Sequence, residues 1–262
     1  KKIKNTDQHT AINRDVSLLG TKGYLLKTLD HSECIFDARE KLERVLKKRI
    51  GSEATLETYH KFVLDDDENT KVFYELTQLF WGGQWHLEIF KKNKKFFSEL
   101  VGLDLDIQAK PHLRIARPAK PQDNIGFHQD TDYGASAYEL SCSISLTTLN
   151  NFSAIQLIPG SHSLTDIKVT AVNNKESEKG STKHQLGVPY LFKILADESL
   201  KSKIIPIPMN IGEVLCFSLA VVHGQEINRG PDTRWSFDAR IKNSFIKSGA
   251  KNGYYINFDN SP

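Results

Sequence analysis

The segment GFHQDTDYG, residues 126–134, places a histidine and an aspartate two positions apart. On an extended strand, side chains at positions i and i+2 point to the same side, so His128 and Asp130 would face one cavity while Gln129 points away. Imidazole nitrogens and carboxylate oxygens are both common metal ligands. The pair therefore predicts two ligands of a metal site, which needs a third ligand from elsewhere in the chain.

His223 is the best candidate for that third ligand among the nine histidines. It ends the apolar stretch EVLCFSLAVVH (213–223), which is typical of a strand, and Gly224 leaves space beside it. Two histidines and one carboxylate leave about three positions open on an octahedral metal, as in non-haem Fe(II) oxygenases. A closed structural zinc site would need four ligands, usually including cysteine.

Arg234 follows His223 by eleven residues and begins RWSFDARI (234–241), which is typical of a further strand. Such a strand can return Arg234 to the cavity of the metal site. A guanidinium there suits a carboxylate ligand, because its planar fork donates two charge-assisted hydrogen bonds. An ion pair with Asp232 or Asp238 is the alternative role.

Taken in this order and spacing, the chain resembles the phytanoyl-CoA dioxygenase-like family of Fe(II)/2-oxoglutarate oxygenases. The resemblance extends over roughly residues 18–245 and is most specific in its combination of motifs. The segments that carry it are GYLLK (23–27), FHQD (127–130), IPGSH (158–162), IGEVLCF (211–217) and HGQEINRGPDTRWSFDARI (223–241).

The resemblance implies that His128, Asp130 and His223 bind Fe(II), and that Arg234 pairs with the distal carboxylate of the cosubstrate 2-oxoglutarate. It implies a hydroxylase that uses O₂ and releases succinate and CO₂. Related enzymes that halogenate carry a small residue in place of the carboxylate ligand. Asp130 therefore favours hydroxylation over halogenation.

Three further residues take roles from the same resemblance. Arg117, in IARP, is implied as a second basic contact to the cosubstrate, with a structural salt bridge as its alternative. Gln225 stands where many members carry serine and is implied as a cosubstrate contact. His162, in PGSH, is expected to support the site rather than to bind metal.

Helices are predicted in the first third of the chain. The stretches 37–50 and 69–80 carry apolar residues at helical spacing, and a further helix is expected over roughly 84–101. Asp37 followed by Glu40 resembles a capping box, which would begin the first of these helices.

After residue 110 the pattern changes to short stretches rich in β-branched and aromatic residues. The predicted fold is mainly β, a double-stranded β-helix of the jelly-roll or cupin type, packed by an N-terminal helical layer. The expected strands lie within 112–118, 137–149, 154–159, 203–209, 213–223 and 234–241.

We expect a single domain over residues 1–262, with its helical layer at about 30–105 and its jelly-roll core at about 110–245. A polar segment at about 163–203 interrupts the core and is predicted to form a lid-like insert.

The composition limits the partners and the location. The 35 basic and 32 acidic residues give a net charge of +3, which does not favour nucleic acid as a partner. No apolar run reaches the roughly 18 residues that would span a bilayer. The three cysteines form no CxxC pair, and the N-terminal residues lack the apolar stretch of a signal peptide. A cytoplasmic enzyme with a small-molecule or glycan substrate is therefore expected.

The substrate is the least determined feature. The insert carries basic residues that suit a polar, acidic substrate, although ordinary solvated surface lysines are the favoured interpretation of them: Lys168, Lys175, Lys179, Lys183 and His184. Three alternatives to the 2-oxoglutarate enzyme stay open: a cupin-type metal enzyme that does not use 2-oxoglutarate, a jelly-roll binding protein without catalysis, and a lectin-like jelly roll.

Overall fold

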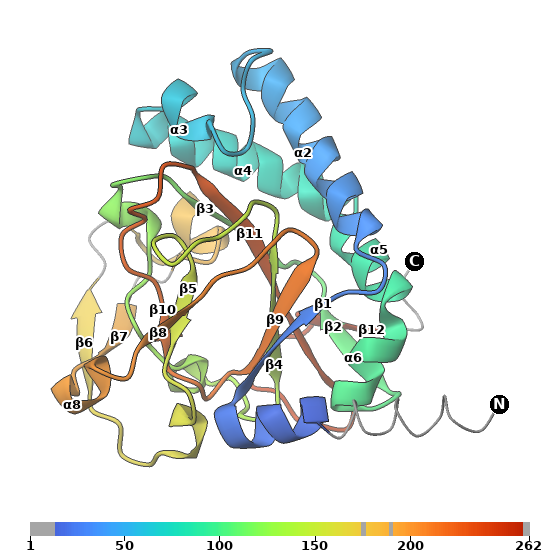
Figure 1. Ribbon diagram of the computed structural model, residues 1–262, viewed down its shortest axis with the longest axis vertical. Helices are drawn as coiled ribbons and strands as arrows, with labels where there is room; N and C mark the ends of the chain where they lie inside the picture. The colour runs from blue at the N-terminus through green and yellow to red at the C-terminus, as the bar shows by residue number, and fades with distance from the viewer. Residues whose placement is uncertain (1–13, 174–176, 189–190, 259–262) are drawn as a thin grey trace.

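The computed structural model describes residues 14–173, 177–188 and 191–258, whose strands pair antiparallel in three sheets (Figure 1). The largest sheet has seven strands in the order β1 (Tyr24–Thr28), β9 (Glu213–Ser218), β4 (Leu140–Ser145), β11 (Arg234–Asn243), β2 (Leu105–Gln108) and β12 (Tyr255–Asn257), and β3 (His112–Ala116) also pairs with β11. The second sheet has the order β10 (His223–Gly224), β5 (Ile155–Leu157) and β8 (Ile205–Ile207).

Helices cover one face of the large sheet, as Figure 1 shows. They are α2 (Glu33–Ile50), α3 (Tyr59–Phe62), α4 (Asp66–Gly82), α5 (Trp85–Lys92) and α6 (Lys94–Val101). The predicted fold class, mainly β with a helical N-terminal layer, is confirmed. The described strands do not close into one continuous barrel, because they are divided between separate sheets.

Successive side chains of β11 point to opposite faces of the large sheet, so the strand contributes both to the core and to the opposite, polar face. One set of alternate residues is fully buried in the core between sheet and helices: Trp235, Phe237, Ala239 and Ile241. Trp235 donates from its indole nitrogen to the carbonyl of Leu56 and contacts Tyr59 edge-to-face. The other set, on the opposite face, is polar: Arg234, Ser236, Asp238 and Arg240.

A second core joins the large sheet to the three-stranded sheet. On β9, Leu215 and Phe217 belong to this core, whereas Val214 and Cys216 pack toward the helices. Ile155 and Leu157 of β5 meet them from the other sheet. The two sheets are thereby held face to face, and the polar side of β11 faces the space between them.

The helix ends differ in part from the sequence expectations. Helix α2 begins at Glu33 after Ser32, so Asp37 lies inside the helix and the predicted capping box is wrong. The segment 84–101 is two helices that meet at Asn93, whose side chain contacts the carbonyls of His31 and Ile89.

The predicted insert at 163–203 has secondary structure of its own. Strands β6 (Val169–Asn173) and β7 (Leu191–Leu195) pair with each other, and the short helices α7 (Thr182–Gln185) and α8 (Glu198–Lys201) flank β7 in the chain. Lys175 lies outside the described residues.

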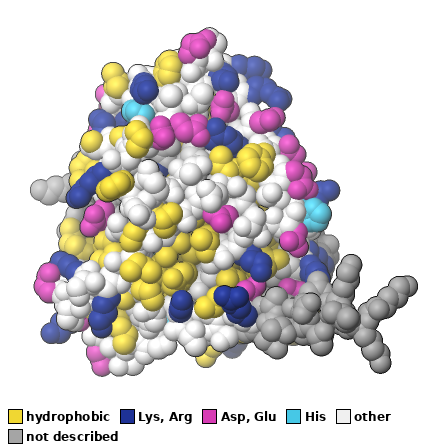
Figure 2. Space-filling view, in the orientation of Figure 1, with side chains coloured by type: hydrophobic (Ala, Val, Ile, Leu, Met, Phe, Trp, Pro, Cys, Tyr) yellow, Lys and Arg dark blue, Asp and Glu magenta, His cyan; other side chains and the backbone are white. Residues whose placement is uncertain are grey.

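The surface in Figure 2 carries hydrophobic side chains near its middle, over the region where Figure 1 places β5, β8 and β1, with charged side chains mainly around the rim. Within the described part of the chain, no helix has the length and apolar character needed to cross a membrane.

Candidate active site

His128 and His223 are brought together by direct backbone pairing. Each donates its amide to the carbonyl of the other at 2.9 Å, which forms an isolated antiparallel bridge between two segments far apart in the chain. Their ring centroids lie 4.5 Å apart. This pairing fixes the spacing of the two imidazoles independently of any ligand.

His223 reaches this position by a route that differs from the prediction. The expected strand 213–223 ends at Ser218, where a turn carries the chain out of the large sheet. The chain then enters β10, where His223 pairs with Leu157 of β5. His223 is therefore supplied by the second sheet, opposite the strands that follow it in sequence.

Asp130 completes the cluster from a turn. Gln129 is extended, but Asp130 begins the 3₁₀ helix η2 (Asp130–Tyr133), so the two-residue strand repeat does not continue through it. Its amide donates to the carbonyl of Leu219 at 2.9 Å, which anchors the turn beside the end of β9. Gln129 donates from its side chain to the carbonyl of Ala220 and does not line the cavity.

One ligand atom each from His128, Asp130 and His223 lies within 4.8 Å of the other two. Nδ1 of His128 contacts the carbonyl of Gly126, and Nδ1 of His223 contacts that of Val221. A backbone carbonyl at Nδ1 makes this nitrogen the donor, so that Nε2 carries the lone pair for a metal.

The charge states suit a cation. Burial lowers the pKa of His223 to about 4, so this imidazole is neutral at neutral pH. Burial opposes the ionisation of Asp130, but the charge of Arg240 and the contact with His128 outweigh it and hold the carboxyl pKa below its usual range. Two histidines and one carboxylate are the donor set of facial-triad iron sites.

Arg234 lies buried at the start of β11 and faces the same cavity. Its Nη2 donates to Ser236 Oγ at 3.2 Å, whereas Nε and Nη1 have no hydrogen-bond partner among the described residues. Burial lowers the pKa of this guanidinium to about 10. Burying a cation whose hydrogen-bond donors have no partner costs free energy. An anion bound in the cavity would pair with these donors and offset that cost.

The wall around Arg234 is built from short side chains and one ion pair. Asp238, one of the two alternative partners suggested for Arg234, pairs with Arg114 of β3 at 2.9 Å. On β4, Ser141, Ser143 and Ser145 stand opposite Arg240, Asp238 and Ser236 in the strand register. Small serines at these positions leave room for the long arginine side chains.

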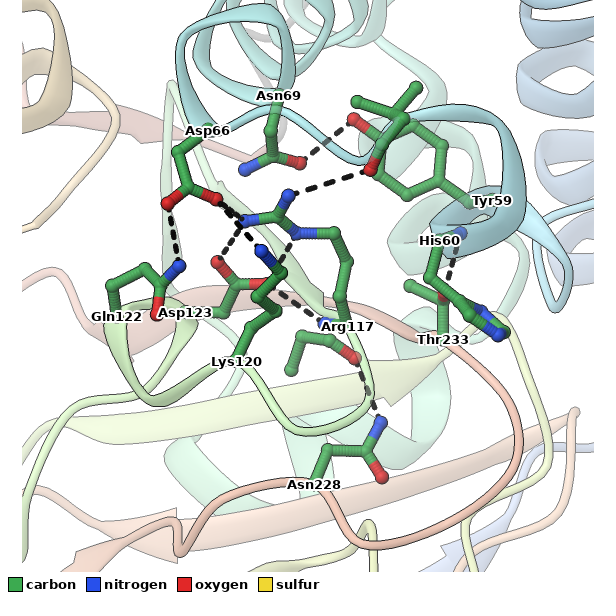
Figure 3. A network of polar contacts seen from close by, with 12 residues as sticks. Tyr59, His60, Asp66, Asn69, Arg117, Lys120, Gln122, Asp123, Asn228 and Thr233 are labelled. Carbon is green, nitrogen blue, oxygen red and sulfur yellow. Dashed lines mark hydrogen bonds and ion pairs between the residues drawn. The ribbon is translucent and has the colours of Figure 1, made fainter.

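Arg117 takes the structural alternative given above. Its guanidinium contacts both carboxylate oxygens of Asp123 at 2.9 Å and Asp66 at 2.7 Å (Figure 3). Its side chain is only 1% exposed. Because these carboxylates already occupy its donors, we assign Arg117 to the attachment of β3 to α4 rather than to the cosubstrate.

Gln225 lies on the cavity wall directly after β10, where its amide donates to the carbonyl of Ile125. The preceding Gly224 is required by close backbone approach. A Cβ added there would lie 2.8 Å from the Cα of Phe127. The glycine therefore lets the His223 segment pair with the His128 segment.

The PGSH motif supports the site from outside. Ser161 is buried, donates to the carbonyl of Ile158 and accepts from the amide of Val222, next to His223. His162 contacts the carbonyl of Gly20 and is not part of the ligand cluster.

The triad residues His128, Asp130 and His223 line one cavity of about 900 Å³, together with Arg234 and Gln225. Residues of the insert close part of it, among them Lys183, His184 and Lys193. The backbone amide of Lys193 donates to the hydroxyl of Tyr133, and its ammonium donates to the carbonyl of Asp132. The insert is thereby tied to the turn that carries Asp130.

A family model matches residues 39–236, and its description is phytanoyl-CoA dioxygenase (PhyH). The chain belongs to this family. Members use Fe(II), 2-oxoglutarate and O₂, so the chain is an oxygenase-type enzyme with these cofactors. Among curated proteins, none matches the chain.

Solved structures with the same fold include three of low sequence identity. ThoJ, a non-heme monooxygenase, is 14% identical with a TM-score of 0.55, over 93% of this chain and 82% of ThoJ. The epimerase SnoN, in complex with Fe³⁺, alpha ketoglutarate and nogalamycin RO, is 14% identical with a TM-score of 0.52, over 90% of this chain and 84% of SnoN. EvdO2 from Micromonospora carbonacea var. aurantiaca is 12% identical with a TM-score of 0.53, over 92% and 94%.

The residues present fit the family cofactors. The donor set of the triad suits Fe(II), and the unmet donors of Arg234 suit a carboxylate in the same cavity. Two cavity features were missed by the sequence reasoning: the pairing of Arg114 with Asp238 and the contact of Arg240 with Asp130. The alternation in RWSFDARI could have placed Asp238 and Arg240 on the same face as Arg234, but it does not indicate their partners.

Proposed function

We propose that the chain is an Fe(II)- and 2-oxoglutarate-dependent dioxygenase that hydroxylates a C–H bond of a polar small molecule. The observation that carries this proposal is the buried guanidinium of Arg234, with two unmet nitrogens, in the cavity lined by His128, Asp130 and His223. A metal site alone would fit a cupin-type enzyme that does not use 2-oxoglutarate. The unpaired arginine favours the keto-acid enzyme, because it supplies a site for an organic anion.

The residues would act as follows. His128, Asp130 and His223 would hold the iron, and Arg234 would pair with the distal carboxylate of 2-oxoglutarate. Gln225, on the adjoining wall, would contact the cosubstrate as well. When bound, iron and 2-oxoglutarate supply the oxidising chemistry, with succinate and CO₂ as co-products. The protein orients the reactants and limits the access of water.

Hydroxylation is favoured by the carboxylate at Asp130, which occupies a position that halogenases keep open. The same scaffold also supports an epimerase, SnoN. Product analysis separates the outcomes, since a hydroxylated product gains one oxygen atom and an epimer keeps the substrate mass.

For the substrate, we propose a polar small molecule of acidic character or a glycan. Support comes from Lys183, His184 and Lys193, which line the cavity from the insert. We also propose a cytoplasmic location, since Cys34, Cys142 and Cys216 are all buried and none forms a disulfide.

The test is succinate release from 2-oxoglutarate in the presence of candidate substrates, with wild type and Asp130→Ala compared. Wild-type turnover should require Fe(II) and O₂, and Asp130→Ala should abolish it. A wild-type protein that binds metal but not 2-oxoglutarate would establish the cupin-type alternative. Coupled turnover restricted to neutral lipids would contradict the substrate proposal.

A further inference from the structure

We infer that Arg240 is a positioning residue that fixes the Asp130 carboxylate so that a single oxygen is presented to the metal. This inference rests on the proposed function, since it concerns the same metal site. Arg240 lies after residue 236, the last one matched by the family model.

The two carboxylate oxygens of Asp130 have different surroundings. Oδ2 pairs with Arg240 Nη2 at 2.9 Å, whereas Oδ1 lies 3.4 Å from Nε2 of His128. Oδ1 therefore stands on the side of the ligand cluster, and Oδ2 is held from behind by a cation. A carboxylate held this way binds metal through one oxygen and leaves the other coordination positions open.

Asp130 needs an external support that the two histidines do not need. Each imidazole is oriented by a backbone carbonyl two residues before it, Gly126 for His128 and Val221 for His223. The Asp130 side chain projects from the first residue of a 3₁₀ turn. Its charged contact therefore comes from a different element, the strand β11.

Arg240 is itself well placed to act as a rigid support. It belongs to the polar face of β11, and its register partner on β4 is the small Ser141. Its backbone amide donates to Gln108 Oε1 at 3.0 Å. Its guanidinium lies over the ring of Tyr254, 5.9 Å from the centroid. The strand, the small neighbour and the aromatic ring together restrict its rotamers.

A competing electrostatic effect has to be separated from this role. The positive charge of Arg240 repels a nearby metal cation, so its removal would strengthen metal binding if charge alone mattered. Positioning predicts the opposite sign. Arg114 offers the matched control, because it is a cavity arginine paired with Asp238 and has no contact with the ligand cluster.

The experiment is a calorimetric titration of the whole chain with Mn(II), which is redox-stable and accepts the same nitrogen and oxygen ligands. We compare the Kd for Mn(II) of five proteins: wild type, Arg240→Gln, Arg240→Lys, Arg114→Gln and Asp130→Ala. Loss of an outer partner of a metal ligand costs about 10- to 100-fold in metal affinity. We expect a loss of this size for Arg240→Gln, a smaller one for Arg240→Lys, and unchanged or tighter binding for Arg114→Gln.

The outcomes are distinguishable. If Asp130→Ala binds Mn(II) like wild type, the metal site of the proposed function is wrong. If Asp130→Ala loses binding while Arg240→Gln keeps the wild-type Kd within about twofold, only the role of Arg240 is overturned. Thermal melting of the metal-free variants identifies unfolding. Should Arg240→Gln be unfolded, Arg240→Lys decides, and a wild-type Kd for that variant overturns the inference.

Discussion

At the level of single residues, three arginines that line the cavity differ in whether a carboxylate already pairs with them. Arg117 is saturated by Asp123 and Asp66, and Arg114 is paired with Asp238. Arg234 alone among these three keeps unmet donors. A buried cation that the fold leaves unpaired is expected to gain most from an anionic ligand.

Replacement of Arg234 by Gln should therefore weaken 2-oxoglutarate binding. At about 1.5–3 kcal/mol each, two hydrogen bonds to a charged group correspond to about 3–6 kcal/mol, or roughly 150- to 25,000-fold in Kd. The measurement is calorimetric titration of the Mn(II)-loaded protein with 2-oxoglutarate. Arg117→Lys is the control, since it keeps the charge beside Asp123. A loss of affinity in Arg117→Lys as large as in Arg234→Gln would show that both arginines contact the cosubstrate.

At the scale of elements, the site depends on contacts between segments that the sequence does not place together. Strand β11 was predictable, because RWSFDARI alternates apolar and polar residues along its length. The turn at Asp130 and the crossing from β9 to β10 were not, since both depend on tertiary hydrogen bonds. These bonds are the contacts of Leu219 with Asp130 and of His128 with His223.

The same limit applies to the individual site residues. His128, Asp130 and His223 were recognisable from residue type and order, and the structure brings them together. The sequence motif around Arg117 did not reveal that the carboxylates of Asp123 and Asp66 surround its guanidinium. Arg240 was overlooked because its partner Asp130 lies 110 positions earlier in the chain, on a turn rather than a strand.

Gly224→Ala tests the approach of these segments. The added methyl would meet the backbone of Phe127 at under 3.0 Å, and backbone atoms cannot give way as a flexible side chain would. The bridge between His128 and His223 should open, so we expect at least tenfold weaker Mn(II) binding and a lower melting temperature. Gly82→Ala is the matched control, because its methyl would enter open space on α4. Wild-type metal affinity in Gly224→Ala would contradict this account of the glycine.

At the level of the whole molecule, different faces of the large sheet serve stability and function. The face toward the helices forms the apolar core, and the other face forms the polar wall of the cavity. The helices bury the apolar face of the large sheet, and the second sheet with the insert encloses its polar face. Substitutions on the helical side should thus change stability without changing the binding of metal or 2-oxoglutarate.

Burial of His86 makes the stability of the folded chain depend on pH. This residue of α5 is fully buried and stacks on Phe80, and burial lowers its pKa to about 4. In the unfolded chain a histidine titrates near its ordinary pKa of about 6.5. Between these values the unfolded state binds a proton that the folded state does not, so the free energy of unfolding falls as the pH is lowered.

His86→Leu should remove this contribution. Lowering the pH from about 6.5 to about 5 should cost wild type roughly 1.5 kcal/mol more than it costs the variant, because the variant has no proton to bind at this position. The measurement is urea unfolding of the metal-free chain at both pH values. Ile89→Val, a truncation in the same core, should lower stability equally at both. An identical pH dependence in wild type and His86→Leu would mean that His86 has the same pKa in the folded and unfolded states, which burial in this apolar core disfavours.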